Sequence, residues 1–314
     1  MQRILDPAQI EGFAERSLPR VRLADPRSLF ARRAQRLREL AQGHSLGDYL
    51  LLMATVAEGQ QLALDSLVPA LRAEQFPQQL GRQIELAHEH RMPPLQIAGW
   101  PRSPRWRDIL NDLCGTVAAA PGFPAGVRSV CERIRSSPQP EIEAQADSLV
   151  LAPAVAAEVS TAPFVMAALQ VYWAGMAATL KGGDVSPIDV VGVCPLCGTL
   201  PVASIVRSDK HSPGYRYLHC GLCATEWHMV RITCSHCFAN EGILYHTVEN
   251  GSQAVRAESC GQCHTYRKIL YQENDPGVEP VADDLASIAL DLLMSEEGFH
   301  RASGNPLLWQ KTEE

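Results

Sequence analysis

Apolar residues recur at helical spacing through the first half of the chain. The segment SLFARRAQRLREL places leucine, phenylalanine and alanine three and four residues apart, and DYLLLMATVAEGQQLALDSL follows with the same period. Pro26 directly after Asp25 predicts that the first of these helices begins there. The stretch 75–101 is richer in proline and glycine and predicts broken helix and loop. Residues 1–184 therefore read as a helical domain.

The most apolar run, APFVMAALQVYWAGMAATL, spans residues 162–180. Nineteen residues are long enough to suggest a transmembrane helix. However, Gln170, Tyr172 and Trp173 interrupt the run, and no excess of basic residues flanks it. The pattern favours a central helix buried on all sides by other helices, with no stable membrane insertion.

After Gly183 the helical period gives way to short runs rich in β-branched and aromatic residues. They are TLPVASIV, GYRYLHC, TEWHMVRITC, ILYHTVE and TYRKILYQ. Interleaved with them are four Cys-x-x-Cys pairs, CPLC, CGLC, CSHC and CGQC. A shift of 40 residues superimposes the first two pairs on the last two, so this region is a duplicated unit. We expect each unit to form its own small antiparallel sheet.

Three chemistries compete for these cysteines. Disulfides are disfavoured because the first twenty residues lack the continuous apolar stretch of a secretory signal, so we expect a reducing cytoplasm. A thioredoxin-type redox site would use a single pair in a βαβ setting. Two pairs joined by a hairpin can instead surround one metal ion, with metal–sulfur distances of about 2.3 Å. The regular spacing predicts two four-cysteine metal sites of zinc-ribbon or rubredoxin type.

The tandem repeat favours ligand sets drawn from within each unit, although a crossed arrangement stays open. The predicted ligands are Cys194, Cys197, Cys220 and Cys223 for one ion, and Cys234, Cys237, Cys260 and Cys263 for the other. Four thiolates suit zinc and iron equally well. His236 and His264 adjoin the second set, but four cysteines already complete each site, so we expect both histidines to be peripheral.

The expected fold is α+β and mainly α. A helical domain (1–184) precedes two cysteine modules (185–231 and 232–271) and an acidic C-terminal segment (272–314). Within that segment an amphipathic helix is expected over 283–295, with one face, which packs against the body, formed by Leu285, Ile288, Ala289, Leu292 and Leu293.

Charge is unevenly distributed. The net charge is −7, and residues 272–314 alone carry ten acidic and two basic side chains. Many zinc ribbons bind nucleic acid, which requires a positive surface, so this balance argues against a nucleic-acid partner. Arg32, Arg33, Arg36 and Arg38 form the main basic cluster, which we interpret as a solvated helix face.

No catalytic motif is present: the chain has no GxSxG, P-loop, HExxH or nucleotide-binding GxGxxG. A site closed by four thiolates also leaves no coordination position for a substrate. The residues themselves thus predict a binding protein rather than an enzyme.

Longer segments resemble the FdhE family of formate dehydrogenase accessory proteins. They are RRAQRLREL, LGDYL, APFVMAAL, YWAGMA, YRYLHCGLCATEWHMVRITCSHC, AESCGQCHTYRKILYQ, VADDLASIALDLLM and NPLLW, spread over nearly the whole chain. The resemblance implies a cytoplasmic maturation factor that associates with the formate dehydrogenase catalytic subunit before its export. It also implies rubredoxin-like iron at the eight cysteines and self-association as a homodimer.

Three functions from different classes follow. The first is a chaperone-like accessory protein that binds the catalytic subunit of formate dehydrogenase through a metal-stabilised surface. The second is a redox or sulfur-handling protein of the same pathway, in which a cysteine–metal centre cycles electrons or thiolates. A nucleic-acid-binding ribbon protein is the third and weakest, because of the charge distribution above.

Overall fold

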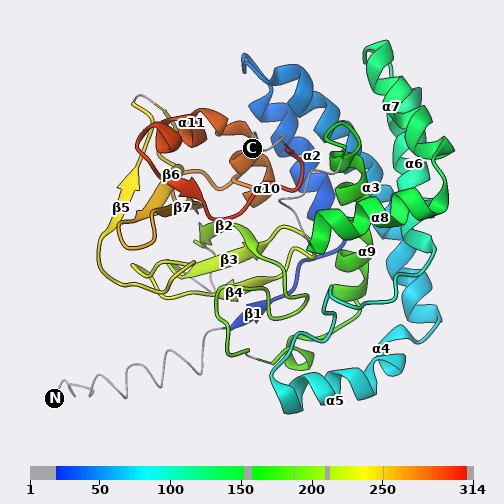
Figure 1. Cartoon of the computed structure of the whole chain (residues 1–314), viewed down its shortest axis with the longest axis horizontal. Helices are drawn as coiled ribbons and strands as arrows, with labels where there is room; N and C mark the ends of the chain where they lie inside the picture. The colour runs from blue at the N-terminus through cyan, green and yellow to red at the C-terminus, as the bar shows by residue number, and fades with distance from the viewer. Residues whose placement is uncertain (1–18, 152–157, 187, 209–212, 250, 310–314) are drawn as a thin grey trace.

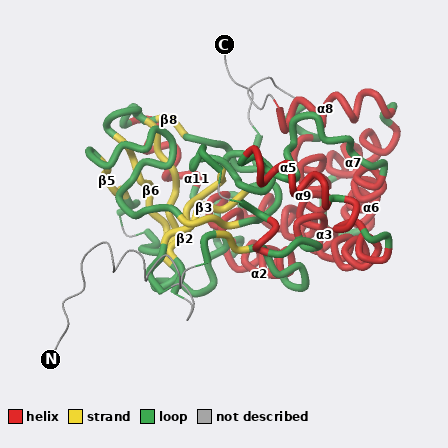
Figure 2. The backbone as a smooth tube through the Cα atoms, turned by 90° about the horizontal axis from the view of Figure 1, so that it is seen from below, coloured by secondary structure: helices red, strands yellow, loops and turns green. Residues whose placement is uncertain are grey.

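The computed structural model describes residues 19–151, 158–186, 188–208, 213–249 and 251–309. The helices are α2 (Leu29–Leu40), α3 (Gly47–Ala73), α4 (Phe76–Gln79), α5 (Gly81–His90), α6 (Arg105–Ala119), α7 (Ala125–Ser136), α8 (Gln139–Leu151) and α9 (Ala162–Ala177), followed by the 3-10 turn η1 (Gly182–Asp184). Helices α3 to α9 gather on one side of the molecule, and the sheet lies on the other side together with helices α10 (Pro280–Ala286) and α11 (Ile288–Glu296) (Figures 1 and 2). Among the described residues the first half is mostly helical, as predicted, including the broken stretch around α4 and α5, but Val21–Arg22 form a strand that joins the sheet.

Helix α2 begins later than the sequence suggests. Its first residue is Leu29 rather than Pro26, because Asp25 accepts from the backbone and side chain of Arg27 in a turn ahead of the helix. The free N–H groups of Phe30 and Ala31 donate to Gln61 Oε1 on α3, at 3.0 and 3.1 Å. The helix start is thus capped from a neighbouring helix, which local sequence does not reveal.

Helix α9 is the centre of the helical side, and every one of its residues is buried. Helix α3 crosses it at Gly175, where a Cβ atom would lie 2.5 Å from Leu67 Cδ2. The polar Gln170 is satisfied inside: it accepts from Gln60 Nε2 at 2.9 Å and donates to the Gly221 carbonyl at 2.6 Å. The prediction of a buried central helix is confirmed. Among the described residues, no helix has the length and apolarity needed to cross a membrane.

The strands of the two cysteine repeats merge into a single sheet. They are β1 (Val21–Arg22), β2 (Pro201–Val206), β3 (Arg216–Cys220), β4 (Glu226–His228), β5 (Ile243–His246), β6 (Val255–Cys260), β7 (Thr265–Tyr271) and β8 (His300–Arg301). Their order is β1-β4-β3-β2-β7-β6-β5, with β8 beside β7. Each repeat is antiparallel within itself, but β2 and β7 pair in parallel and join the repeats. The α+β fold class is confirmed, whereas the expectation of two separate sheets is wrong.

The C-terminal helix is broken into α10 (Pro280–Ala286) and α11 (Ile288–Glu296). Glu279 caps α10 by accepting from the backbone N–H groups of Val281 and Ala282, so the helix begins before Asp283. The break at Ser287 changes which face of the second half is buried. Leu290 and Met294 point inward, while Leu292 is 64% exposed and Leu293 is also exposed. The prediction of a single helix over 283–295, with Leu292 and Leu293 on its inner face, is therefore wrong.

Helix α10 lies between α2 and the sheet (Figure 1) and is held there by ion pairs. The buried Arg33 guanidinium lies 3.0 Å from Glu279 Oε1, and Arg36 pairs at 2.6 Å with both Asp275 and Asp283. The basic cluster is consequently not a solvated face, since only its members Arg32 and Arg38 are exposed. Carboxylates of the acidic C-terminal segment neutralise the other two arginines, Arg33 and Arg36.

Candidate metal centres

The four cysteines of the first repeat converge at one end of the sheet. Cys194 Sγ lies 3.6 Å from Cys223 Sγ, and Cys197 Sγ lies 3.5 Å from Cys220 Sγ. All four sulfurs are within 4.8 Å of one another and belong to buried residues. A tetrahedron with metal–sulfur bonds of about 2.3 Å has edges of roughly 3.8 Å, so the spacing suits a metal ion. It is far longer than the ~2.05 Å of a disulfide.

The second repeat builds the same arrangement. Cys234 Sγ lies 3.7 Å from Cys263 Sγ, and Cys237 Sγ lies 3.6 Å from Cys260 Sγ. Here Cys237 is exposed and Cys263 is half-buried, in contrast to the fully buried first cluster. Both clusters form within a repeat, so the crossed arrangement that the sequence left open does not occur.

One backbone device shapes all four Cys-x-x-Cys turns. The residue after each pair is left-handed: Gly198 (φ 83°), Ala224 (φ 58°), Phe238 (φ 63°) and His264 (φ 52°). In three of the turns the N–H of this residue donates to the carbonyl of the first cysteine, at 2.8 Å from Gly198, 3.1 Å from Phe238 and 2.9 Å from His264. The tight turn brings both sulfurs to one side. Only at Gly198 does the residue type predict this left-handed conformation, because alanine, phenylalanine and histidine rarely adopt it.

Backbone amides also point at the sulfurs. Leu222 N and Cys223 N lie 3.4 and 3.3 Å from Cys220 Sγ. In the second repeat, His236 N and Cys237 N lie 3.4 and 3.5 Å from Cys234 Sγ. Donors aimed at sulfur stabilise the thiolate form, which is the form that binds metal.

The electrostatics of the first cluster suit a bound cation. Burial, reinforced by the neighbouring thiols, raises the pKa of Cys194 well above that of an ordinary thiol. At Cys220, hydrogen bonds from the other cysteines and from Thr199 outweigh burial and lower the pKa. The thiolate form is thus favoured at Cys220, while Cys194 holds its proton. A bound metal ion would displace the thiol protons, which makes its affinity depend on pH.

The donor set fits both zinc and iron, since each forms tetrahedral four-thiolate sites. Within the part of the chain that the structure describes, each cluster consists of four sulfurs and includes no histidine. His236 is exposed, and the His264 ring lies 6.1 Å from the Phe299 ring, centroid to centroid. A bound ion would supply a cross-link between two turns and, if it were iron, one-electron chemistry.

Sequence reasoning missed a polar group that adjoins the first cluster. His219, next to Cys220 on β3, faces Glu226 across the β3–β4 pair, with His219 Nδ1 3.2 Å from Glu226 Oε1. Arg207 also pairs with this carboxylate. Although burial opposes it, the charges of Arg207 and His219 and their hydrogen bonds lower the pKa of Glu226 to about 2. In the sequence, only the position of His219 beside a cysteine indicated this group. Its pairing with Glu226 depends on the register of β3 and β4, which the sequence does not show.

Three family models match the chain in succession. They are the FdhE N-terminal model over residues 18–189, the FdhE central domain over 193–231 and the FdhE C-terminal domain over 232–308. Together they span the helical side, both cysteine clusters and helices α10 and α11.

Curated relatives match over nearly the full length. The "Protein FdhE homolog" of Cronobacter sakazakii is 40% identical, covering 98% of this chain and 97% of the relative. "Protein FdhE" of Salmonella paratyphi A is 41% identical, covering 90% of this chain and 89% of the relative. The crystal structure of the FdhE protein from Pseudomonas aeruginosa superimposes with a TM-score of 0.79 at 35% identity, over 92% of this chain and 98% of that one.

Proposed function

The chain belongs to the FdhE family, and from this premise we propose that it is an accessory protein for maturation of a formate dehydrogenase. In this proposal it acts in the cytoplasm, without catalysing a reaction, and binds the immature catalytic subunit. Two metal ions, held by the cysteines of the first and second repeats, keep the contacting surface rigid. A homodimer is the assembly that the family resemblance favours.

The observation that carries the proposal is the surface around the second cluster. Cys237 is exposed, and exposed apolar side chains flank the cluster in sequence: Val230 (61%), Ile232 (59%) and Phe238. The Phe238 ring also reaches the first repeat, because a Cβ atom on Gly192 would lie 3.1 Å from Phe238 Cζ. Exposed apolar side chains offer contact area to a partner protein. We call Val230, Ile232 and Phe238 the apolar rim.

A pull-down tests this surface. Ile232→Ser and Val230→Ser should together weaken capture of the catalytic subunit by about tenfold or more, since each removes exposed apolar contact area. Leu62→Ser is the matched control, because Leu62 is equally exposed (66%) but lies on α3 in the helical part. Undiminished capture by the double variant would exclude the apolar rim as the contact. A chain that never captures the subunit would contradict the accessory function itself.

A second candidate function also has a specific observation behind it. The exposed Cys237 leaves one sulfur of the second cluster within reach of a reductant or an external thiol, as a redox or sulfur-handling centre requires. Ultraviolet–visible spectra of the purified protein distinguish the two functions. A ferric–thiolate band that disappears and returns with reductant and oxidant supports the redox function, whereas zinc in both clusters contradicts it.

A further inference from the structure

Arg267 on β7 is a buried arginine without an ion pair. The residue is 4% exposed, and no carboxylate among the described residues lies within ion-pairing distance of its guanidinium. The guanidinium donates instead to three neutral oxygens, which are Ser235 Oγ at 2.8 Å, Ser303 Oγ at 2.5 Å and the Pro201 carbonyl. Because a buried charge without a counter-charge is costly, the fold holds this cation at an energetic disadvantage.

The charges packed around Arg267 leave one cation over. They are four cations and three carboxylates: Arg216, Arg267, Lys268 and Arg301 against Glu258, Asp284 and Asp291. Glu258 lies opposite Arg267 on β6, but it is paired with Arg216 at 2.6 Å. The two aspartates are paired with the lysine and with Arg301. The cation left without a partner is therefore Arg267.

The second cysteine cluster lies beside this cation. Ser235, which accepts from Arg267, directly follows Cys234 in the CSHC turn. Arg267 also lines one crevice with Cys234 and Cys260, the two buried sulfurs of the cluster. The crevice has a volume of about 10 Å³, too small for more than one water molecule, so little solvent screens the charge. Four thiolates around a divalent ion carry a net charge of −2, which is opposite in sign to the guanidinium.

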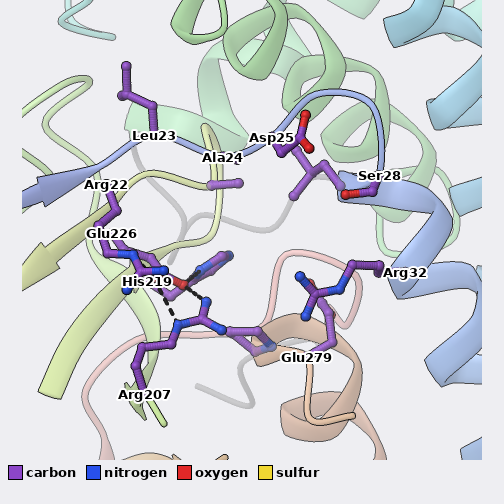
Figure 3. Close-up of a pocket in the computed structure, with 13 residues that line it drawn as sticks. Arg22, Leu23, Ala24, Asp25, Ser28, Arg32, Arg207, His219, Glu226 and Glu279 are labelled. Atoms are coloured by element: carbon purple, nitrogen blue, oxygen red, sulfur yellow. Dashed lines mark hydrogen bonds and ion pairs between the residues drawn. The ribbon is translucent and has the colours of Figure 1, made fainter. Parts of the chain in front are cut away.

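The pocket beside the first cluster, in contrast, is balanced in charge. It adjoins Cys220, because His219 contributes to its wall. Three arginines and three carboxylates line it in Figure 3: Arg22, Arg32, Arg207, Asp25, Glu226 and Glu279. Among them Arg207 and Glu226 form an ion pair. The left-over buried cation thus belongs to the setting of the second cluster.

We propose that Arg267 is the counter-charge of the second metal site, so that its guanidinium stabilises the metal-loaded form. The inference rests on the metal ions of the proposed function. When a metal ion binds, the thiols lose their protons and the site becomes anionic, and a fixed buried cation lowers the energy of that state. For the same reason the guanidinium favours ferrous over ferric iron, because the ferrous site carries one more negative charge.

A zinc titration of the full-length protein, read separately at each site, tests the affinity. A chelator buffer sets the free zinc concentration, unprotected thiols are alkylated, and peptide mapping gives the occupancy of each cluster from its own cysteines. Arg267→Gln should weaken zinc binding at the second site by about tenfold or more and change the first site by less than about threefold. Arg267→Lys keeps the charge and should stay within about threefold of the wild type at both sites.

The reduction potential of the iron-loaded protein provides a second readout. In Arg267→Gln, the ferric–ferrous equilibrium of one of the two ions should shift towards ferric by about tenfold, which corresponds to about 59 mV. Arg256→Gln is the matched control. It also removes a cation from the sheet, but Arg256 lies at the end of β6 remote from Cys260, with its guanidinium 4.7 Å from the centre of the Tyr271 ring. This variant should change neither the zinc affinity nor the potential.

Three results would overturn the inference. They are unchanged zinc affinity of the second site in Arg267→Gln, an unshifted potential in that variant, and a loss in Arg267→Lys as large as in Arg267→Gln. The last result would show that the hydrogen bonds matter rather than the charge, and it decides the question even if Arg267→Gln fails to fold. A wild-type chain that binds no zinc would contradict the metal sites of the proposed function as well, whereas normal wild-type binding with unaffected variants contradicts this inference alone.

Discussion

Arg216 on β3 of the first repeat and Glu258 on β6 of the second form a buried ion pair, with Arg216 Nη2 2.6 Å from Glu258 Oε1. The two residues lie on strands that are not neighbours, and the pair spans β2 and β7 between them. Ser204 Oγ on β2 also accepts from Arg216, and Tyr245 donates to Glu258 at 3.1 Å. A buried ion pair thus connects the two cysteine repeats within the single sheet.

This pair predicts a strongly non-additive mutant cycle. Glu258→Leu alone should lower the free energy of unfolding by about 3–5 kcal/mol, because it leaves the buried Arg216 charge without a counter-charge. The double variant Arg216→Met/Glu258→Leu should recover most of that loss. Chemical denaturation followed by circular dichroism measures the wild type, both single variants (Glu258→Leu and Arg216→Met) and the double variant. Additive effects of the two substitutions would show that the charges are not coupled.

A second prediction concerns the link between the helical part and α10. Arg33→Met leaves the buried Glu279 without its counter-charge and should cost about 3–5 kcal/mol. Arg38→Met serves as control, because Arg38 and Glu58 are both nearly half exposed and such pairs contribute about 1 kcal/mol or less. Thermal unfolding should also become broader in Arg33→Met as the two parts uncouple. Equal losses in both variants would contradict a special role for the buried pair.

The unequal exposure of the two clusters predicts unequal metal lability. Elemental analysis of anaerobically purified protein should find two metal ions per chain and identifies them as iron or zinc. A chromogenic chelator should then remove one equivalent about tenfold or more faster than the other, from the cluster that contains the exposed Cys237. Cys237→Ser should abolish the fast phase and leave the slow one. Two equivalents released at a single rate would refute the assignment.

Iodoacetamide labelling provides an independent readout of the same difference. The first motif cysteine to react should belong to the second cluster, as Cys237 or Cys263, since the cysteines of the first cluster are buried. Peptide mapping by mass spectrometry locates the label. Early modification of Cys197 would contradict the burial that the structure assigns to the first cluster.

The lowered pKa of Glu226 predicts that the free energy of unfolding decreases at acidic pH. The folded-state pKa of about 2 lies below the ordinary 4.5, so the unfolded chain binds more protons between these values. The stabilisation from Glu226 is therefore complete above about pH 4.5 and is lost as the pH falls towards 2. It amounts to something on the order of 3 kcal/mol.

The difference between wild type and Glu226→Gln isolates this contribution, because protonation of the cysteines affects both proteins alike. The difference in unfolding free energy should be largest at neutral pH and should shrink below pH 4.5. Urea denaturation at several pH values measures it. A difference that stays constant from pH 7 to pH 3 would show that Glu226 is not held ionised by Arg207 and His219.

The sequence by itself determined the chemistry of the chain and the kind of each element. The pattern of the α9 run favoured a buried helix, and the 40-residue repeat favoured two groups of four cysteines, because ligand spacing is a local property. The family followed from long local motifs for the same reason. These features depend on residues that are near one another in the chain.

Tertiary structure decided what depends on residues that are distant in sequence. The parallel pairing of β2 with β7, which fuses the repeats, has no local signal because parallel register is set by packing. Arg33 looked solvated until α10, almost 250 residues later, brought Glu279 to it. Likewise Leu292 seemed inward-facing until the break at Ser287 turned it to solvent. Helical period fixes which residues share a face, but only the fold selects the face that is buried.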